Sequence, residues 1–138
     1  MLVGATRPDL AGLGEGFDAF WHERHLCTLT TVRSDGTPHV VPVGVTLDAG
    51  TAIARVITSR GSYKARLVAA AGPAGAPAAV CQVDGRRWST LEGRAVLRDT
   101  PEEVADAERR YTLRYRAPRV NPDRVVIEIQ VTRVLGNV

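Results

Sequence analysis

Three β-forming segments follow one another in the first half of the chain, and only short turns separate them. Residues 26–32 alternate between apolar and polar side chains and are rich in Thr and Val, and similar segments follow at 38–47 and 51–58. The connections at 34–37 and 48–50 contain Asp and Gly, which favour tight turns. Because strands joined by tight turns pair antiparallel, these segments predict strands in hairpin order.

The second half of the chain continues this pattern. Residues 78–83 and 87–98 flank an Asp84-Gly85 turn, and residues 124–134 form a last alternating strand. About six strands in hairpin order, with short helices between them, predict a mainly β protein. A six-stranded antiparallel β-barrel fits this order better than a parallel sheet does.

Short helices are predicted at three places. Apolar residues recur at helical spacing over 13–24, and a second helix is expected over 62–71. Thr100 followed by Pro101 and Glu103 is typical of a capped helix start. We expect residues 1–12 to be frayed and residues 13–138 to form a single domain.

Composition excludes several classes of protein. The 138 residues are 44% hydrophobic and 24% charged, which is ordinary for one globular domain. The net charge of +3 is scattered and is not interleaved with aromatic residues, so no nucleic-acid partner is expected. No apolar run could span a membrane and no signal peptide is evident, so a cytoplasmic location is expected. Cys27 and Cys81 lie in apolar strands and are predicted to be buried thiols.

Two features of the predicted barrel leave alternatives open. Pro42 and Gly44 fall inside a predicted strand, where they indicate either a bulge in an edge strand or a backbone surface on which a flat ligand can lie. His22 and His25 are three residues apart, whereas a zinc helix needs a spacing of four, so no metal site is expected.

The segment 55–64 is the strongest candidate for a ligand site. A strand ends in Thr58 and Ser59, the chain turns at Gly61, and a helix is expected to start at Ser62. The first N–H groups of a helix lack internal partners and attract anions. The only lysine among 18 basic residues, Lys64, lies beside this turn. The pattern predicts a phosphate site, and an ordinary solvated helix start is the alternative.

Other catalytic signatures are missing from the sequence. There is no GxSxG, no GxGxxG and no P-loop, and no pair of carboxylates suited to acid and base catalysis. An anion site without an evident nucleophile or metal favours a bound cofactor that supplies the chemistry.

Several motifs taken together resemble a known family. They are Asp35-Gly-Thr-Pro-His-Val-Val-Pro-Val-Gly44, Gly61-Ser-Tyr-Lys64, Cys81-Gln-Val-Asp-Gly85, Trp88-Ser-Thr-Leu-Glu-Gly93 and the ending that runs from Arg109 through Pro118. This order resembles the pyridoxamine-phosphate-oxidase-like split β-barrels. Within that family the chain is similar to the branch that uses the deazaflavin coenzyme F420, and to the F420-dependent biliverdin reductases in it.

The resemblance implies a homodimer with two cofactor sites at the subunit interface. It also implies a set of cofactor-binding positions, from the end of the third strand, the lysine after it, the strand that backs the ring system and later barrel positions. These are Arg55, Ile57, Thr58, Ser59, Lys64, His39, Val41, Pro42, Gln82 and Trp88. Leu67 stands where the family has asparagine, and the loop at 70–77 is longer than usual.

The implied activity is hydride transfer from reduced F420 to a conjugated small molecule, with biliverdin and its product bilirubin as the first choice. An FMN-dependent enzyme on the same barrel is one alternative. A non-catalytic carrier of the cofactor or of a tetrapyrrole is another. No catalytic side chain is assigned. The two propionates of biliverdin would suit arginines around the mouth of the site, and the candidates are Arg60, Arg86, Arg87 and Arg116.

Overall fold

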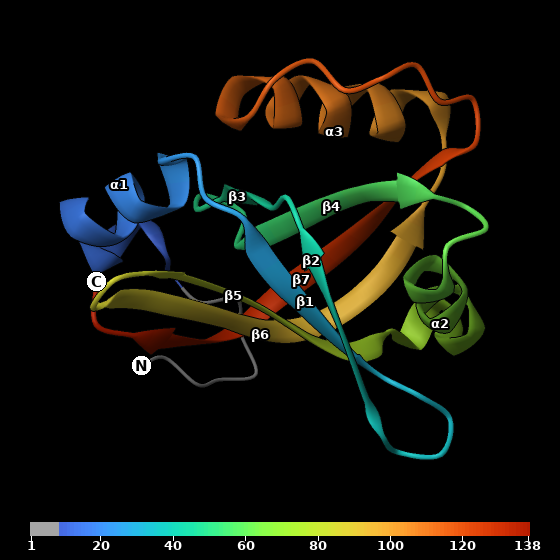
Figure 1. Ribbon diagram of the computed structural model, residues 1–138, viewed down its shortest axis with the longest axis horizontal. Helices are drawn as coiled ribbons and strands as arrows, with labels where there is room; N and C mark the ends of the chain where they lie inside the picture. Colours follow the sequence, from blue (N-terminus) through green and yellow to red (C-terminus); the bar gives the residue numbers. More distant parts are fainter. Residues whose placement is uncertain (1–8) are drawn as a thin grey trace.

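The computed structural model describes residues 9–138 as one seven-stranded antiparallel sheet with short helices around it (Figure 1). The strands are β1 (Cys27–Val32), β2 (Pro38–Val43), β3 (Thr46–Asp48), β4 (Ile53–Ser59), β5 (Ala76–Asp84), β6 (Arg87–Arg98) and β7 (Arg124–Gly136). The α-helices are α1 (Glu15–His22), α2 (Tyr63–Ala71) and α3 (Pro101–Arg114), and short 3-10 turns cover Ala11–Leu13 and Gly72–Ala74.

The order of the strands requires the sheet to close on itself. The sheet runs β2-β1-β5-β6-β7-β4-β3, so its two edges are β2 and β3. In a flat sheet these edges would be about 29 Å apart, since neighbouring strands are spaced about 4.8 Å. Only Gly44 and Val45 connect them, and the chain from Val43 to Thr46 reaches at most about 11 Å. The mainly β, antiparallel barrel predicted from the sequence is therefore confirmed.

The strand count differs from the six expected, because residues 38–47 form two strands. The break falls at Gly44, where a Cβ atom would lie 2.8 Å from the Tyr111 ring and 3.2 Å from the Tyr115 ring. Glycine is needed there because the Tyr111 ring of α3 and the Tyr115 ring directly after it approach the backbone. β2 is also an edge strand, which explains how it accommodates Pro42. The surface expected to hold a flat ligand is thus partly covered by the protein's own rings.

Alternating side chains of the strands fill the barrel. Leu29, Val80, Leu91 and Ile127 are fully buried, and each comes from a different strand. The register shifts between Glu92 and Gly93, where an added Cβ would lie only 2.0 Å from the Gln130 carbonyl oxygen. This bulge helps β6 and β7 to curve, since bulges increase the local twist of a sheet.

The helices are placed at the barrel's ends and along one side. α1 closes one end with Phe17, Phe20 and Trp21, which are buried, and α2 lies at the opposite end (Figure 1). α3 lies along the outside of β4 (Figure 1). The predicted capping box of α3 is confirmed, with the Thr100 side chain and the Glu103 side chain each bonded to the other's backbone N–H.

Several boundaries and burial predictions are corrected. Of the segment expected to be frayed, residues 1–8 lie outside the described residues, whereas Leu10 is buried in the core. The first α-helix is shorter than 13–24, because Gly14 adopts a positive φ of 98° before it. Cys27 is buried as predicted, but Cys81 is only half-buried. No helix within 9–138 is long and apolar enough to cross a membrane.

Candidate functional site

A cavity of about 700 Å³ opens where β4 ends and α2 begins. Ligand sites for small molecules and cofactors typically enclose about 300–1,000 Å³. Its walls come from the end of β2, the end of β4, the start of α2, one side of α3 and the loop that follows α3. The lining residues are Pro42, Val43, Gly44, Ile57, Thr58, Ser59, Lys64, Tyr111, Arg116, Ala117, Pro118, Arg119, Asn121 and Arg124.

The start of α2 leaves backbone donors beside this cavity. Ser62 caps the helix, because its hydroxyl oxygen accepts a hydrogen bond from the Ala65 N–H across 3.3 Å. The N–H groups of Tyr63 and Lys64 have no acceptor within residues 9–138. The predicted helix start at Ser62 is thus confirmed. Two open N–H groups and the positive end of the helix dipole suit an anion.

Lys64 adds a positive charge that no described carboxylate neutralises. Its side chain is partly buried, and it forms neither a hydrogen bond nor an ion pair with any of residues 9–138. Burial lowers the pKa of Lys64, because partial removal of water disfavours the charged ammonium. A bound anion would oppose this effect, because a nearby negative charge favours the charged ammonium.

Hydroxyl groups at the end of β4 are oriented by their neighbours. Thr58 donates to the Ser62 hydroxyl across 2.9 Å, and Ser59 accepts from the Asn121 side-chain amide across 2.9 Å. Ser59 and Ser62 each keep their own O–H for a further acceptor, since a hydroxyl both donates and accepts. The turn therefore offers hydroxyl, amide and ammonium donors on one wall of the cavity.

The loop after α3 forms the opposite wall, and reasoning from the sequence missed most of it. Asn121 ties this loop to Ser59, and the Arg60 N–H donates to the Asp123 carbonyl across 2.9 Å. The exposed Arg116 and Arg119 therefore lie across the cavity from β4. Of the four candidate arginines, Arg116 lines this cavity. For the rest of the loop the sequence offered only the prolines at 118 and 122 that end the helix.

Five of the ten predicted cofactor-binding residues line this one cavity: Pro42, Ile57, Thr58, Ser59 and Lys64. Their place in the sequence, at the ends of β2 and β4 and the start of α2, explains why they meet. Their binding of a cofactor remains a prediction.

Three further predicted residues lie near the cavity but outside its lining. The His39 ring packs edge-on against Tyr63, with ring centres 4.9 Å apart, and Val41 packs against the barrel core. Arg55 lies under α3, with its Nε 3.9 Å from the Asp106 carboxylate. Its Nη1 group is buried without a hydrogen-bond partner, so Arg55 retains donor capacity.

Gln82 and Trp88 lie elsewhere in the barrel. Gln82 is 1% exposed, and its amide is bonded to the Phe20 carbonyl and to Arg114. Trp88 precedes Ser89, which pairs with Gly136 at one end of β7, whereas Ser59 pairs with Arg124 at the other end. These ends are separated by about 40 Å of strand. Within one chain, neither residue reaches the cavity.

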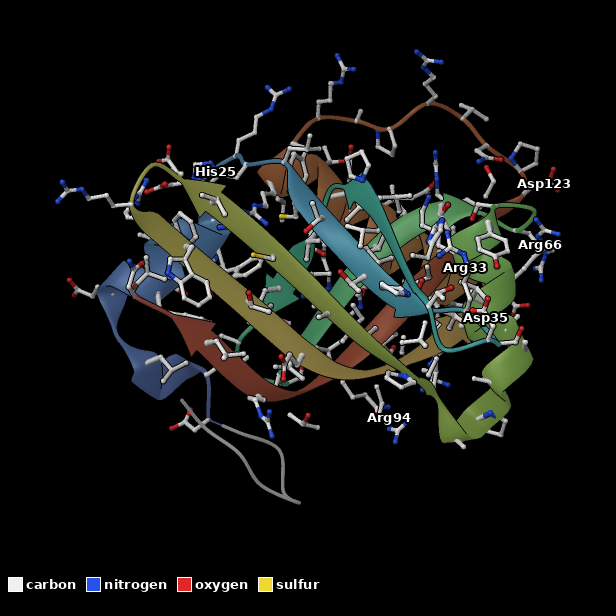
Figure 2. The ribbon with its side chains drawn as sticks, turned by 60° about the horizontal axis from the view of Figure 1, so that its bottom comes forward. His25, Arg33, Asp35, Arg66, Arg94 and Asp123 are labelled. Carbon is white, nitrogen blue, oxygen red and sulfur yellow. The ribbon has the colours of Figure 1, made fainter. Side chains whose placement is uncertain are left out.

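A basic cluster surrounds Tyr63 beside the cavity. The guanidinium carbons of Arg33 and Arg66 lie 5.9 Å and 5.6 Å from the centre of the Tyr63 ring. Figure 2 shows both arginines beside α2, while His25 lies at the other end of the barrel. Neither arginine forms an ion pair with a described carboxylate. The cluster therefore extends the positive charge of Lys64 along the helix.

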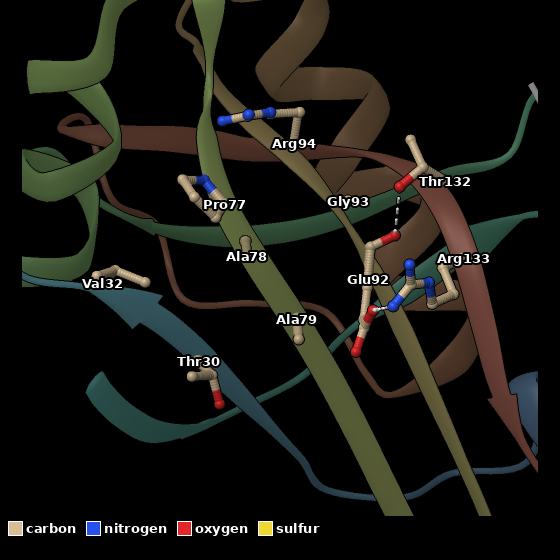
Figure 3. Close-up of a pocket in the computed structure, with 10 residues that line it drawn as sticks. All are labelled: Thr30, Val32, Pro77, Ala78, Ala79, Glu92, Gly93, Arg94, Thr132 and Arg133. Carbon is tan, nitrogen blue, oxygen red and sulfur yellow. Dashed lines mark hydrogen bonds and ion pairs between the residues drawn. The ribbon is translucent and has the colours of Figure 1, made fainter. Parts of the chain in front are cut away.

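A second cavity, of about 470 Å³, lies on the outer face of β1, β5, β6 and β7 (Figure 3). Its centre is formed by small side chains such as Ala79 and Thr30, and Glu92 pairs with Arg133 across 3.5 Å at its side (Figure 3). Val32, which also lines the cavity, and Val40 on the adjacent strand β2 are exposed. No predicted site residue lines this cavity.

One cluster among residues 9–138 has the composition of a metal site. Ligand atoms of Glu23, His25 and Asp84 lie within 4.8 Å of one another. However, Arg87 forms ion pairs with both carboxylates, and hydrogen bonds from Arg87 and His25 lower the pKa of Glu23 to about 2. The arginine already supplies the positive charge, so the cluster is an ion-pair network.

Comparison with known proteins places this geometry in a family. The pyridoxamine 5'-phosphate oxidase family matches residues 13–137, and the chain belongs to it. Within the family, the chain is 56% identical over 119 residues to the F420H(2)-dependent biliverdin reductase of Mycobacterium tuberculosis (strain CDC 1551 / Oshkosh). That match covers 86% of this chain and 84% of the reductase.

Solved structures share the fold at lower identity. An F420 reductase superposes with a TM-score of 0.69 and 23% identity, covering 89% of this chain and 98% of that one. A conserved hypothetical protein from Mycobacterium tuberculosis gives a TM-score of 0.72 at 21% identity, covering 96% and 89%. At these identities the likeness establishes the split-barrel fold.

Proposed function

We propose that this protein is an F420H2-dependent reductase that transfers a hydride to biliverdin and forms bilirubin. The relative at 56% identity is named for this activity. The observation in this chain that carries the proposal is the partly buried Lys64, which lines a cofactor-sized cavity without an anionic partner among residues 9–138. Reduced F420, when bound, supplies the hydride.

The start of α2 would hold the anionic part of the coenzyme. Lys64 contributes charge, the Tyr63 and Lys64 N–H groups contribute backbone donors, and the Ser59 hydroxyl adds a further donor. Charge-assisted hydrogen bonds of this kind are stronger than neutral ones. Pro42 and Ile57 offer the apolar surface in the same cavity that a flat ring needs.

The loop after α3 would receive the acceptor. Arg116 and Arg119 are exposed on the cavity wall and form no ion pair with a described carboxylate. Biliverdin carries two propionate groups, and guanidinium groups bind carboxylates in a bidentate manner. The acceptor would thus be oriented by its carboxylates, with its central carbon held toward the coenzyme.

We also propose that two copies of the chain associate through the outer face that contains the second cavity. Val32, Val40 and Val83 are exposed there, and Trp88 is 37% exposed. An uncovered apolar sheet face favours association. In such a dimer, the Trp88 of the second copy would be able to approach the first cavity, which this chain's own Trp88 does not reach. The cytoplasmic location expected from the sequence remains a prediction.

Binding and turnover measurements test the activity. Purified protein is titrated with F420 and with FMN, following the fluorescence of each, and is then mixed with F420H2 and biliverdin while bilirubin absorbance is recorded. Tight F420 binding with bilirubin formation is expected. Tight FMN binding in a yellow preparation would favour the FMN enzyme, and binding of F420 without turnover would favour a carrier.

Light scattering after size-exclusion chromatography tests the association. The wild-type chain is expected at twice the mass of 14.9 kDa. Replacing the exposed Val40 with Lys should shift the protein to a monomer, because a buried charge opposes the contact. The same change at the exposed Leu113, on α3 and away from this face, should leave the dimer intact. A wild-type monomer would refute the dimer.

A further inference from the structure

No residue has been assigned to one step of the proposed reaction, the delivery of a proton to the acceptor. Adding a hydride to the central carbon of a conjugated tetrapyrrole places negative charge on a ring nitrogen, which must then take up a proton. A positioned side-chain acid typically accelerates such a step by about 100-fold or more. This need for a proton rests on the proposed function, and the lining of the cavity is the place to look for the group that gives it.

The cavity lining contains few groups that are able to give up a proton. Arg116, Arg119 and Arg124 remain protonated in proteins, and the Arg124 guanidinium is also paired with Glu108. The Thr58 hydroxyl already donates to Ser62. Lys64 would lose its hold on an anion if it gave up its proton. Ser59 keeps its O–H, but an aliphatic hydroxyl is a much weaker acid than a phenol. Tyr111 is therefore the most acidic donor left in the lining.

The Tyr111 ring is held in a fixed place on the cavity wall. It projects from α3, lies against the backbone of Gly44 and stacks on Tyr115 with ring centres 4.9 Å apart and planes inclined by 30°. A Cβ on residue 44 would be 2.8 Å from this ring, so the ring is in close contact with the backbone. Such contacts restrict the orientation of the ring and thereby the position of its hydroxyl oxygen, and a restricted position favours proton transfer.

The hydroxyl group of Tyr111 is available, in contrast to that of Tyr115. The Tyr111 hydroxyl makes no hydrogen bond to any group within residues 9–138. It is not one of the buried polar atoms that lack a partner, so it is open to solvent. The Tyr115 hydroxyl donates to the His25 carbonyl across 2.6 Å and accepts from the Val45 N–H across 3.1 Å. One tyrosine of the stacked pair is therefore structural, and the other presents a free phenol at the cavity.

We propose that Tyr111 is the proton donor to the acceptor. The Tyr111 O–H bond breaks as an N–H bond forms on the acceptor's ring nitrogen, while the hydride from the reduced coenzyme forms a C–H bond at the central carbon. The acceptor thereby gains the two electrons that the coenzyme loses. The Tyr111 oxygen regains its proton from water, which also takes up the proton that the coenzyme releases on oxidation.

The test compares Tyr111→Phe with Tyr115→Phe. Tyr111→Phe should keep the melting temperature, the F420 affinity and the biliverdin affinity, while its single-turnover rate falls by about 100-fold or more. Tyr115→Phe should lower the melting temperature and keep the rate of the folded protein. A second measurement needs no coenzyme: biliverdin bound to the coenzyme-free wild type should absorb at a different wavelength from biliverdin bound to Tyr111→Phe, because a phenol polarises the ring nitrogen.

Each result separates this inference from the function on which it rests. If the wild type reduces biliverdin and Tyr111→Phe matches its rate and its bound spectrum, water gives the proton and the inference is overturned, while the proposed activity stands. If the wild type binds F420H2 but does not reduce biliverdin, the proposed function is wrong and this role of Tyr111 is wrong with it.

Discussion

The guanidinium group of Arg114 donates to the Gln82 side-chain oxygen across 2.6 Å, and both side chains are buried. Arg114 also donates to the backbone carbonyls of Glu23 and Val45, and the Gln82 amide donates to the Phe20 carbonyl across 2.7 Å. This pair therefore fastens the end of α3 to the barrel and to α1. It contains no carboxylate. Carbonyl oxygens stabilise the buried charge together with the rings of Trp21 and Tyr115, whose centres lie 5.4 Å and 5.3 Å from the guanidinium carbon.

Replacing Gln82 with Leu should destabilise the protein without affecting the coenzyme. Three buried hydrogen bonds are lost, from Arg114 and Cys27 to the side-chain oxygen and from the amide to the Phe20 carbonyl, so the free energy of unfolding should fall by about 2–4 kcal/mol. Urea denaturation measures this change. Gln130→Leu, at an exposed position of β7, is the matched control and should change stability by less than about 0.5 kcal/mol. Weaker F420 binding at unchanged stability would instead make Gln82 a cofactor ligand.

Tyr115 should make stability sensitive to alkaline pH. Burial raises the pKa of Tyr115 to about 12, because the phenolate would have to form away from water. The unfolded chain ionises near pH 10, so the protonated hydroxyl contributes full stability below about pH 10 and this contribution is lost as the pH rises through about 12. We expect a loss of about 1–2 kcal/mol after solvent screening.

Absorbance titration and urea denaturation at several pH values check this window. Tyr115→Phe should remove the ionisation step near pH 12 and flatten the stability curve between pH 10 and 12. If the stability of the wild type does not change between pH 10 and 12, the Tyr115 hydroxyl is not held in the buried, hydrogen-bonded position described above.

The same Gly→Ala change should have opposite effects at two places. At Gly44 the new methyl group would lie 2.8 Å from the Tyr111 ring, so we expect a loss of about 1–3 kcal/mol from overpacking. At Gly16, in α1, nothing lies within 4 Å and the φ angle is not positive, so Ala should stabilise by up to about 1 kcal/mol. Thermal denaturation measures the stability of both variants. If the two changes have equal effects, the Tyr111 ring moves away from the new methyl group at residue 44 at little cost.

Local patterns in the sequence predicted the features that depend on neighbouring residues. The capping box at Thr100, the helix start at Ser62 and the hairpin around Gly85 were all predicted correctly, because each depends on residues within a few positions. The break at Gly44 was not, since it depends on a ring of α3 nearly seventy residues further along the chain. The glycine indicated a close approach but did not identify the group that approaches.

The residues of the candidate site also fall into two groups: those that local sequence patterns predicted, and those that only the fold brings to the cavity. Thr58, Ser59 and Lys64 were identified because a strand end, a turn and a helix start are adjacent in the sequence. Tyr111 and Asn121 were not, because α3 and the loop after it reach the cavity only through the folded barrel. Gln82 lies in a strand of alternating pattern, and that pattern could not distinguish a core amide bonded to Arg114 from a residue that lines a pocket.

Lys64 provides the most direct test of the anion site. Replacing it with Met removes a partly buried charge that has no partner among residues 9–138, and whose pKa is lowered by burial. The coenzyme-free protein should therefore be as stable as the wild type or more so, because an unpaired buried charge costs free energy. Its affinity for F420 should fall by about 10- to 150-fold, the equivalent of one charge-assisted contact.

Arg109→Met, which removes a 65% exposed charge from α3 outside the cavity, is the control and should keep the affinity. Fluorescence titration and thermal denaturation are measured on the same samples. A Lys64→Met protein that melts early but binds F420 as tightly as the wild type would show that Lys64 supports the fold and that the anion binds elsewhere.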